Sequence, residues 1–314
     1  MTNILKVGNL IAEPCSKVQG FLQVVNSDIQ MPITLINGKT PGKTVVITGG
    51  THGGEYPGVE TSIRLASGLV PEDICGKIIV VHPVNVPAFF AKMQYEGPDD
   101  GKNLNRMFPG KATGTVTERI AYTITSELFS IADFYMDLHG GDIHESLTPF
   151  VIYYAEGNEE VASVSKEASS LLGIKYVVGS ASTNGTFGCA AGLGVPGFLA
   201  EIGQCGLWCE KEVSDYMKGV VNVLKYLGVL EGKVENFGEV IYVNRMSGLD
   251  AEQTGCWYPS VKINDIVKQG DKIGEIRDLF GKTLGEYYAT VDGVVLYVIS
   301  SLAINKGNPL IAIG

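Results

Sequence analysis

The hydrophobic pattern changes in character along the chain. Through the first 230 or so residues, short uninterrupted apolar runs alternate with stretches whose apolar residues recur every three or four positions. Runs such as Val45 to Ile47 and Lys77 to Val81 are typical of strands covered on both faces, whereas the periodic stretches are typical of amphipathic helices. This alternation predicts an α/β fold with a mixed, largely parallel sheet flanked by helices.

Local signals give the helices their expected starts. Pro57 suits a first helical turn, Thr115 and Glu118 form a capping-box pattern, and further helices are expected over 159–172 and 211–228. The inner faces of the first two helices are predicted to hold Val59, Ile63 and Ala66, and Ile120, Ile124, Leu128 and Ile131.

The composition changes after residue 232. From about 235 to 314, short apolar runs are separated by frequent glycines, which is an all-β pattern. We therefore expect a catalytic α/β domain over 1–232 and a β-rich domain over 233–314. Turns at 269–274 and 292–294 resemble those of biotinyl and lipoyl carriers, but no modifiable lysine stands on a suitable hairpin tip. A structural domain that packs over the active-site cleft is predicted, rather than a swinging arm.

Composition and charge exclude several classes of partner. The 314 residues are 45% hydrophobic and 18% charged, with a formal net charge of -10 and no basic patch, so we expect no nucleic-acid or anionic-membrane partner. The N-terminal residues do not resemble a signal peptide, and no apolar run approaches the roughly 18 residues of a membrane span. Six scattered cysteines without a Cys-x-x-Cys pair favour reduced thiols and a cytoplasmic protein. Homo-oligomerisation is left open.

Candidate chemistry begins in the glycine-rich stretch that follows the Val45 strand. It places His52 and Glu55 at the carboxyl end of a strand, where open α/β sheets bind ligands. This His-x-x-Glu pair can put an imidazole nitrogen and a carboxylate oxygen on one zinc ion. Alternatively, His52 caps the following helix and Glu55 favours its positive end. A third ligand elsewhere would decide for the metal.

The third ligand is expected at the end of another strand. Residues 134–141 read as a strand with a polar tip, in which Asp137 and His139 point to the same face because strand side chains alternate. His139 is the candidate ligand, and Asp137 is a candidate acceptor that fixes its ring. His82, beside a proline at another strand end, is interpreted as structural.

Three motifs together resemble a known family. They are Gly-Thr-His52-Gly-Gly-Glu55, Asp100-Gly-Lys-Asn-Leu-Asn105-Arg106-x-Phe-Pro-Gly and Asp137-Leu-His139-Gly. In order and spacing they are similar to the signatures of the succinylglutamate desuccinylase and aspartoacylase family, within the carboxypeptidase-A-like zinc hydrolases. The resemblance covers about residues 40–230.

The resemblance implies a role for each matching residue. One zinc ion per chain is held by His52, Glu55 and His139, and Glu201, at the end of a strand, acts on the zinc-activated water as general base and then acid. Asn105 and Arg106 bind a substrate carboxylate. From the residues alone, Glu201 could instead be a salt-bridge or rim residue, and Arg106 could tie its own loop to the fold.

Some positions depart from the family pattern or stay undecided. Many members have a second arginine for the oxyanion, but Lys92 and Lys102 are the only cations over 85–105 here. His144 and Glu145 are interpreted as part of a solvated loop. The sequence does not decide whether Tyr287 or Tyr288 reaches the site.

These expectations combine into one functional hypothesis. It is zinc-dependent hydrolysis of a small amide, foremost the deacylation of an N-acyl amino acid, with a small carboxylate-bearing compound as substrate. The alternatives are a metallocarboxypeptidase on short peptides and a zinc-binding protein without turnover. In aspartoacylases a C-terminal β-domain narrows access to the zinc, and the same is expected here.

Overall fold

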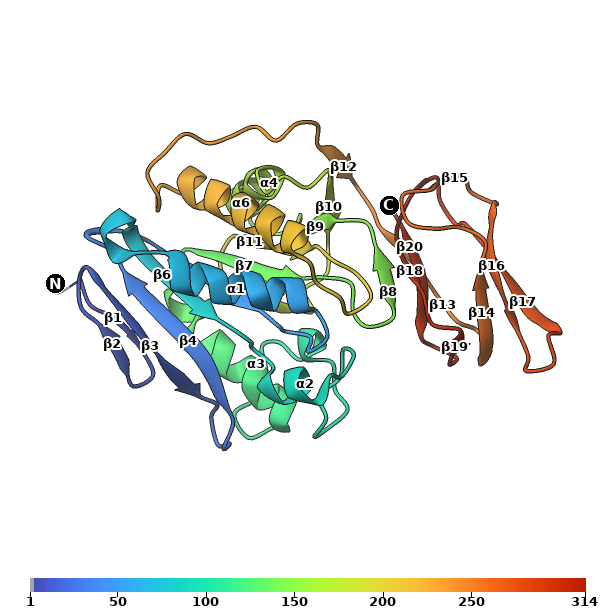
Figure 1. Cartoon of the computed structure of the whole chain (residues 1–314), viewed down its shortest axis with the longest axis horizontal. Coiled ribbons are helices and arrows are strands. Elements are labelled where there is room, and N and C mark those ends of the chain that lie inside the picture. Colours follow the sequence, from blue (N-terminus) through green and yellow to red (C-terminus); the bar gives the residue numbers. More distant parts are fainter. Residues whose placement is uncertain (1–2) are drawn as a thin grey trace.

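The computed structural model describes residues 3–314 and contains one large mixed sheet and a group of smaller antiparallel sheets (Figure 1). Helices cover both faces of the large sheet, and the smaller sheets of the C-terminal part lie at one end of the molecule. The predicted fold class, a largely parallel α/β sheet followed by an all-β region, is confirmed.

The large sheet has nine strands. In spatial order they are β12 (Ile241–Val243), β10 (Tyr176–Ser180), β9 (Phe150–Tyr154), β11 (Gly197–Glu201), β7 (Phe134–His139), β5 (Thr40–Gly49), β6 (Cys75–Val81), β4 (Gln30–Asn37) and β3 (Ser16–Gln23). The pairs β9–β11, β6–β4 and β4–β3 are antiparallel and the others are parallel. A separate hairpin joins β1 (Leu5–Val7) to β2 (Leu10–Ala12). At the centre, β11, β7 and β5 run in one direction, so their carboxyl ends lie side by side.

Helices pack on the sheet much as the apolar periodicity predicts. One face carries α1 (Tyr56–Gly68), α4 (Glu159–Ser170) and α6 (Glu210–Tyr226), and the other carries α3 (Val116–Glu127) and α5 (Thr186–Gly192). The shorter helices are α2 (Val86–Ala91), η1 (Pro71–Asp73), η2 (Leu104–Arg106) and η3 (Phe129–Ile131). The prediction of an inward position is wrong for Ile63 and Ile131, which are both exposed. Ile63 faces outward on α1, and Ile131 belongs to η3, beyond the end of α3.

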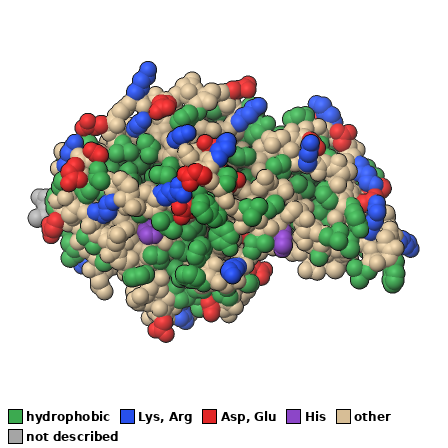
Figure 2. All heavy atoms as spheres, in the orientation of Figure 1, with side chains coloured by type: hydrophobic (Ala, Val, Ile, Leu, Met, Phe, Trp, Pro, Cys, Tyr) green, Lys and Arg blue, Asp and Glu red, His purple; other side chains and the backbone are tan. Residues whose placement is uncertain are grey.

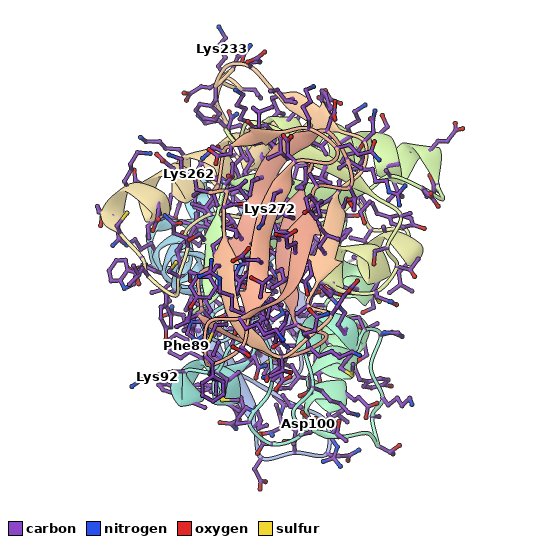
Figure 3. The ribbon with its side chains drawn as sticks, turned by 90° about the vertical axis from the view of Figure 1, so that its right-hand side faces the viewer. Phe89, Lys92, Asp100, Lys233, Lys262 and Lys272 are labelled. Carbon is purple, nitrogen blue, oxygen red and sulfur yellow. The ribbon has the colours of Figure 1, made fainter. Side chains whose placement is uncertain are left out.

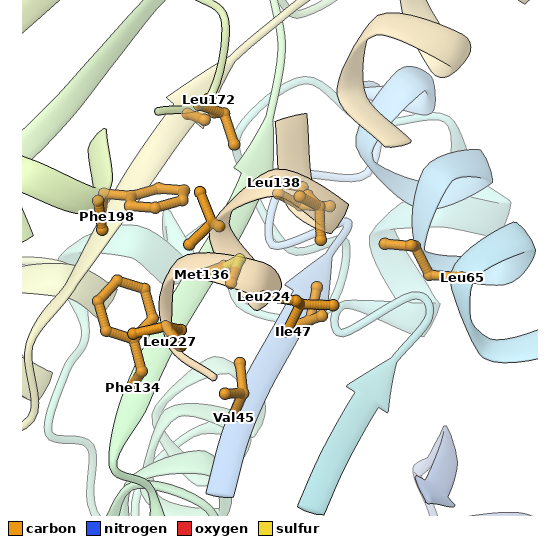
Figure 4. Close-up of a cluster of buried hydrophobic side chains, with 14 of the residues drawn as sticks. Val45, Ile47, Leu65, Phe134, Met136, Leu138, Leu172, Phe198, Leu224 and Leu227 are labelled. Carbon is orange, nitrogen blue, oxygen red and sulfur yellow. The ribbon is translucent and has the colours of Figure 1, made fainter. Parts of the chain in front are cut away.

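Large apolar side chains fill the space between the sheet and the first helix layer. Figure 4 shows Ile47 and Met136 of the sheet near Leu224 of α6, with Leu65 of α1 alongside. All four are essentially inaccessible to solvent. Burying each such side chain stabilises the fold by about 1.5–3 kcal/mol. This packing fixes the strands whose ends carry the site.

The C-terminal part consists of two packed sheets. One contains β13 (Ser247–Asp250), β20 (Pro309–Ile313), β18 (Gly293–Ile299) and β15 (Ile266–Val267); the other contains β17 (Thr283–Tyr288), β16 (Lys272–Arg277), β14 (Gly255–Pro259) and β19 (Ala303–Ile304). Trp257 lies in the core between them. On the outer face, Lys272 forms ion pairs with Glu275 and Glu286 (Figure 3).

A strand from the N-terminal half completes the first of these sheets. Strand β8 (Glu145–Leu147) follows the His139 loop and pairs antiparallel with β18, so that Leu147 lies opposite Tyr297. The large sheet in turn takes β12 from beyond residue 232. A domain boundary near 232 is still our proposal, and these two exchanges join the parts on either side of it.

Charged side chains of both signs occur on the face that Figure 2 shows. Lysine and arginine side chains are interspersed there with aspartate and glutamate. Among the described residues, no helix has the length and apolarity that a membrane crossing requires. The six cysteines are free thiols.

Candidate metal centre

The loop between β5 and α1 has a conformation that only a glycine-rich sequence adopts easily. Gly50 has φ of +76°, a region that side chains with a Cβ disfavour. Gly58 lets α1 approach the central strand, because a Cβ there would lie 2.1 Å from the carbonyl oxygen of Leu138. As a result Glu55 stands at the N-cap of α1, three residues after His52, beside the end of β7.

Three predicted ligands converge in one buried cluster. The ligand atoms of His52, Glu55 and His139 all lie within 4.8 Å of one another. Nδ1 of His52 is 2.6 Å from Oε1 of Glu55, and Nδ1 of His139 is 2.8 Å from Oε2 of the same carboxylate. The contact to His139 is not aligned as a hydrogen bond, so within residues 3–314 this buried nitrogen has no hydrogen-bond partner. Both Nδ1 atoms face the same carboxylate, so the three groups can serve a common ion once the two nitrogens carry no proton.

The remaining nitrogen of each imidazole is held by the protein. Nε2 of His139 lies 2.8 Å from Oδ2 of Asp137, and Nε2 of His52 lies 3.0 Å from Oδ1 of Asn103. Each acceptor favours the tautomer that carries hydrogen on Nε2 and leaves Nδ1 free to bind a metal. The predicted contact of Asp137 is present. Asn103 was missed, although it lies inside the Asp100–Arg106 motif.

Asp137 is itself fully buried and surrounded by hydroxyl donors. Its carboxylate accepts hydrogen bonds from Thr48 at 2.7 Å, Thr51 at 3.1 Å and Thr186 at 2.6 Å. Burial alone would raise the pKa of Asp137, but His139 and these hydroxyls lower it below its ordinary value. The carboxylate thus stays ionised as an acceptor for the histidine.

The donor set fits a metal ion. Two neutral imidazoles and one carboxylate are typical nitrogen and oxygen ligands of catalytic zinc, which leaves a fourth position open. Burial alone would raise the pKa of Glu55, but the protonated rings of His139 and His52 lower it to about 2, so the carboxylate is ionised and ready to bind an ion that replaces those protons. The buried triad is thus consistent with a metal ion.

Glu201 lies next to the cluster on the neighbouring strand. It ends β11 and is in parallel register with His139 on β7, so both side chains emerge from the same face of the sheet. Among the described residues its buried Oε2 atom has no hydrogen-bond partner. Burial, and next the charge of Glu55, raise the pKa of Glu201 well above its ordinary value. This carboxyl group is therefore disposed to hold a proton.

The Asn105–Arg106 segment approaches the same region from the long loop. Oδ1 of Asn105 accepts a hydrogen bond from the backbone N–H of Thr186, which ties the loop to the start of α5. Arg106 is exposed, and its Nη1 donates to the carbonyl of Asn105 at 3.0 Å. One guanidinium nitrogen thus ties the arginine to its own loop, and the pair's role towards a substrate carboxylate stays a prediction.

The two upstream lysines and His82 do not belong to the cluster. Lys102 forms an ion pair with Glu118 at 3.3 Å, and Lys92 is exposed at the end of α2 (Figure 3). The ring of His82 lies 3.1 Å from the hydroxyl of Thr34, which supports its structural interpretation.

The tyrosine of the C-terminal part that senses the charged groups of the site is neither of the two considered. Tyr287 packs edge-on against Trp257 and Tyr288 is exposed. Instead, Tyr297 of β18 is partly buried: burial first, and then the carboxylates of Glu145, Asp250 and Glu201, raise its pKa, whereas Arg106 opposes them. Tyr297 could not be predicted from the sequence pattern, because its position depends on the pairing of β8 with β18.

The position of Glu145 contradicts the expectation that it lies on a solvated loop. His144 is exposed as predicted, but Glu145 is only partly exposed and its Oε1 accepts a hydrogen bond from the hydroxyl of Tyr95 at 2.7 Å. The Tyr95 ring is edge-on to His52, with ring centres 5.7 Å apart. The prediction of a solvated loop is wrong for Glu145, since β8 carries it back against the metal-centre loop.

Comparisons with known proteins agree with this geometry. An N-alpha-acetyl-L-2,4-diaminobutyric acid deacetylase from Halomonas elongata is 30% identical over 294 residues, which cover 91% of this chain and 85% of that protein. The product-bound structure of the ectoine utilization protein EutE (DoeB) from Ruegeria pomeroyi has a TM-score of 0.88 at 26% identity, covering 100% of this chain and 99% of that one.

Two further matches identify the family. A succinylglutamate desuccinylase/aspartoacylase from Rhodobacter sphaeroides has a TM-score of 0.82 at 26% identity, covering 95% of each chain. Residues 41–227, more than half of the chain, match the succinylglutamate desuccinylase/aspartoacylase catalytic domain, and this range contains every residue of the triad. The chain therefore belongs to the succinylglutamate desuccinylase/aspartoacylase family, whose members are hydrolases of amide bonds.

Proposed function

We propose that this protein is a zinc-dependent deacylase of N-acyl amino acids. The observation that carries the proposal is the convergence of His52, Glu55 and His139 beside Glu201 in a chain of this family. A carboxyl group next to a metal-ligand triad supports hydrolysis by an activated water molecule, without a covalent intermediate.

The residues of the triad would hold one zinc ion per chain. When bound, zinc supplies Lewis-acid activation of a water molecule and of the substrate's amide carbonyl. The protein's contribution is to orient both rings with Nδ1 towards the common site, which Asp137 and Asn103 do by accepting from the opposite ring nitrogens. Zinc, rather than a harder cation, is favoured by a donor set that includes two imidazoles.

Glu201 would carry the proton in two steps. As general base it takes a proton from the attacking water, and as general acid it gives this proton to the nitrogen of the departing amine. The amide C–N bond breaks in the second step and the acyl group leaves as a carboxylate. The buried position of Glu201, which raises its pKa, supports this role because a more basic carboxylate is a better proton acceptor.

Asn105 and Arg106 would bind the carboxylate of the amino-acid part. A guanidinium matches a carboxylate with two parallel hydrogen bonds. Within residues 3–314 the Arg106 guanidinium makes one hydrogen bond to the protein, from Nη1, which leaves donors available for a ligand. The amide nitrogen of Asn105 can add a donor, because its oxygen is the atom that holds Thr186.

The similar Halomonas protein is named for its action on an N-acetylated diamino acid, so N-α-acetyl-L-2,4-diaminobutyrate is the first compound to test. The experiment measures zinc content of the purified protein and, on the same sample, release of free amine from a panel of N-acyl amino acids and dipeptides. About one zinc per chain, with chelator-sensitive release from an N-acyl amino acid, is the expected result.

Three outcomes would overturn the proposal. Preferential cleavage of dipeptides would make the protein a carboxypeptidase, and zinc without turnover of any compound would make it a binding protein. A protein that takes up no metal after incubation with zinc would refute the assignment of the triad.

A further inference from the structure

Glu145 occupies a special position between the metal centre and the C-terminal sheets. It is the first residue of β8, where it pairs with Ile299 of β18, and it lies six residues after the ligand His139. Its Oε1 accepts a hydrogen bond from Tyr95, whose ring lies edge-on to that of the ligand His52 at 5.7 Å, so the carboxylate lies beside the metal centre. Unlike its neighbour Asp142, which is fully buried, Glu145 is accessible in part.

The contacts of this carboxylate leave its charge without a partner. Oε1 accepts from the neutral hydroxyl of Tyr95 at 2.7 Å, and Oε2 accepts from the backbone N–H of Asp142 at 3.3 Å. In the described chain, 3–314, ion pairs with lysine, arginine or histidine involve neither Glu145 nor Asp142. Buried carboxylates are normally paired with a cation, because desolvation of an isolated charge is costly. A cation from a ligand would supply the missing partner.

The charges around the site point the same way. Five carboxyl groups surround it, namely Glu55, Asp137, Asp142, Glu145 and Glu201. Glu55 and Asp137 contact the histidines of the metal centre, whereas Asp142 and Glu145 have no cationic partner among the described residues. This side of the site therefore opposes a second carboxylate on a substrate and favours an ammonium group.

We propose that Glu145 is a specificity residue that binds a side-chain ammonium group of the substrate, so that the enzyme selects N-acyl derivatives of diamino acids over neutral and acidic ones. The inference rests on the proposed deacylase function. It differs from a preference for succinylated or aspartate substrates, whose extra carboxylate would face Glu145 without a cation between them.

Tyr297 of β18, the strand that pairs with β8, would lie near both ends of such a substrate. Burial and then the carboxylate of Glu145 raise the pKa of Tyr297, whereas the guanidinium of Arg106 lowers it. With the α-carboxylate on Arg106, a short side chain can place its ammonium group towards Glu145. The two charged ends of one zwitterionic amino acid would then match two opposite charges of the protein, which fixes the orientation of the amide bond.

The test compares three substrates that differ in side-chain charge. They are the N-α-acetyl derivatives of L-2,4-diaminobutyrate, L-2-aminobutyrate and L-aspartate, and kcat and KM are measured for each with zinc-loaded enzyme. We expect the cationic compound to be preferred, and Glu145→Gln to lower the ratio of kcat/KM for the cationic over the neutral compound by about 10- to 100-fold. The change should lie mainly in KM, because the ammonium group is bound equally in the ground and transition states.

Glu96→Gln is the matched control, since Glu96 is an exposed carboxylate in the segment that carries Tyr95. It should leave the ratio unchanged, which separates a local contact from a general charge effect. A wild-type preference for the neutral or acidic compound, or an unchanged ratio in Glu145→Gln, would overturn the inference while the deacylase function stands.

Binding of the products keeps the inference testable if no compound is hydrolysed, an outcome that would refute the deacylase function. Thermal shifts of the zinc-loaded protein with free 2,4-diaminobutyrate and with 2-aminobutyrate are then compared. A larger shift with the diamino acid that Glu145→Gln removes supports the ammonium site, and equal shifts refute it.

Discussion

Each imidazole of the candidate metal centre has one nitrogen occupied by the protein and the other directed at Glu55. Asp137 and Asn103 are the two acceptors, and they come from different parts of the chain. Asp137 was predictable because it lies two positions before His139 on a strand, where side chains share a face. Asn103 was not predictable in this way, since its position depends on how the long loop folds over His52.

Asp137 should control metal affinity. In Asp137→Asn the amide cannot accept from Nε2 of His139 as strongly as the carboxylate does, so the ring loses orientation and basicity. We expect zinc affinity to fall by about 10- to 100-fold. Competition with a chromogenic chelator measures this value. Asp133→Asn is the control, because the Asp133 carboxylate lies outside the cluster and accepts a hydrogen bond from the backbone N–H of Thr44. Equal losses of zinc affinity in both variants would contradict the assignment.

Glu201 should control turnover without controlling metal content. Glu201→Gln keeps the size of the side chain but cannot accept a proton, so we expect the rate of amine release to fall by about 10²- to 10⁴-fold with zinc content unchanged. Elemental analysis and initial rates on the same preparation measure both quantities. A variant that keeps the wild-type rate would assign the base to another residue, and one that loses its zinc would make Glu201 a structural residue.

At the scale of elements, the segment from Tyr95 to Lys111 lacks regular structure except for η2, yet it is held firmly at one end. Asp100 accepts hydrogen bonds from the hydroxyl of Thr117 at 2.6 Å and from the backbone N–H of Thr117 at 3.0 Å, which fastens the loop to the start of α3. The Asn103–Arg106 motif is thereby carried on an anchored loop.

Asp100→Asn should therefore destabilise the protein, by about 1 kcal/mol. Burial by itself would raise the pKa of Asp100, but the hydrogen bonds from Thr117 lower it below the ordinary value. A lowered folded-state pKa means that the stabilisation is present above the unfolded-state pKa of about 3.9 and is lost as the pH falls further.

The difference in unfolding free energy between wild type and Asp100→Asn should consequently be largest near neutral pH and should become smaller below about pH 4. Urea unfolding at a series of pH values measures it. The exposed neighbour Asp99 provides the control variant Asp99→Asn, and a difference that does not depend on pH would show that the Asp100 charge is not involved.

The helices and longer strands were largely predictable, but the pairing of strands between the N-terminal and C-terminal parts was not. Helices α1, α3, α4 and α6 follow from apolar periodicity and start signals, because each buries one face on the same large sheet. Strand β8 has three residues, and its partner β18 lies about 150 residues away. Period-two patterns need longer segments, so neither this pairing nor the resulting positions of Glu145 and Tyr297 could be read from the sequence.

For the whole molecule, metal binding should couple to stability. The triad brings together ligands from the β5–α1 loop and from β7 in a buried centre, and an ion bound to the folded state alone stabilises it by mass action. Free zinc at a thousandfold excess over its Kd contributes about 4 kcal/mol. We expect chelation to lower the melting temperature by several degrees and added zinc to restore it.

Differential scanning calorimetry with and without a chelator measures this effect. His52→Ala provides the control, because without one ligand the melting temperature should respond little to either addition. An equal response in wild type and His52→Ala would place the stabilising zinc elsewhere on the protein.

The pairing of β8 with β18 also sets an order of events during synthesis. Leu147 leaves the ribosome about 150 residues before Tyr297, which corresponds to about 8 to 30 s at about 5–20 residues per second. His52, Glu55 and His139 are made before this interval and Glu201 within it, whereas the strand that carries Tyr297 is made only at its end. A nascent chain can thus acquire its metal before it acquires the last wall of its substrate site, so metal loading need not wait for a finished protein.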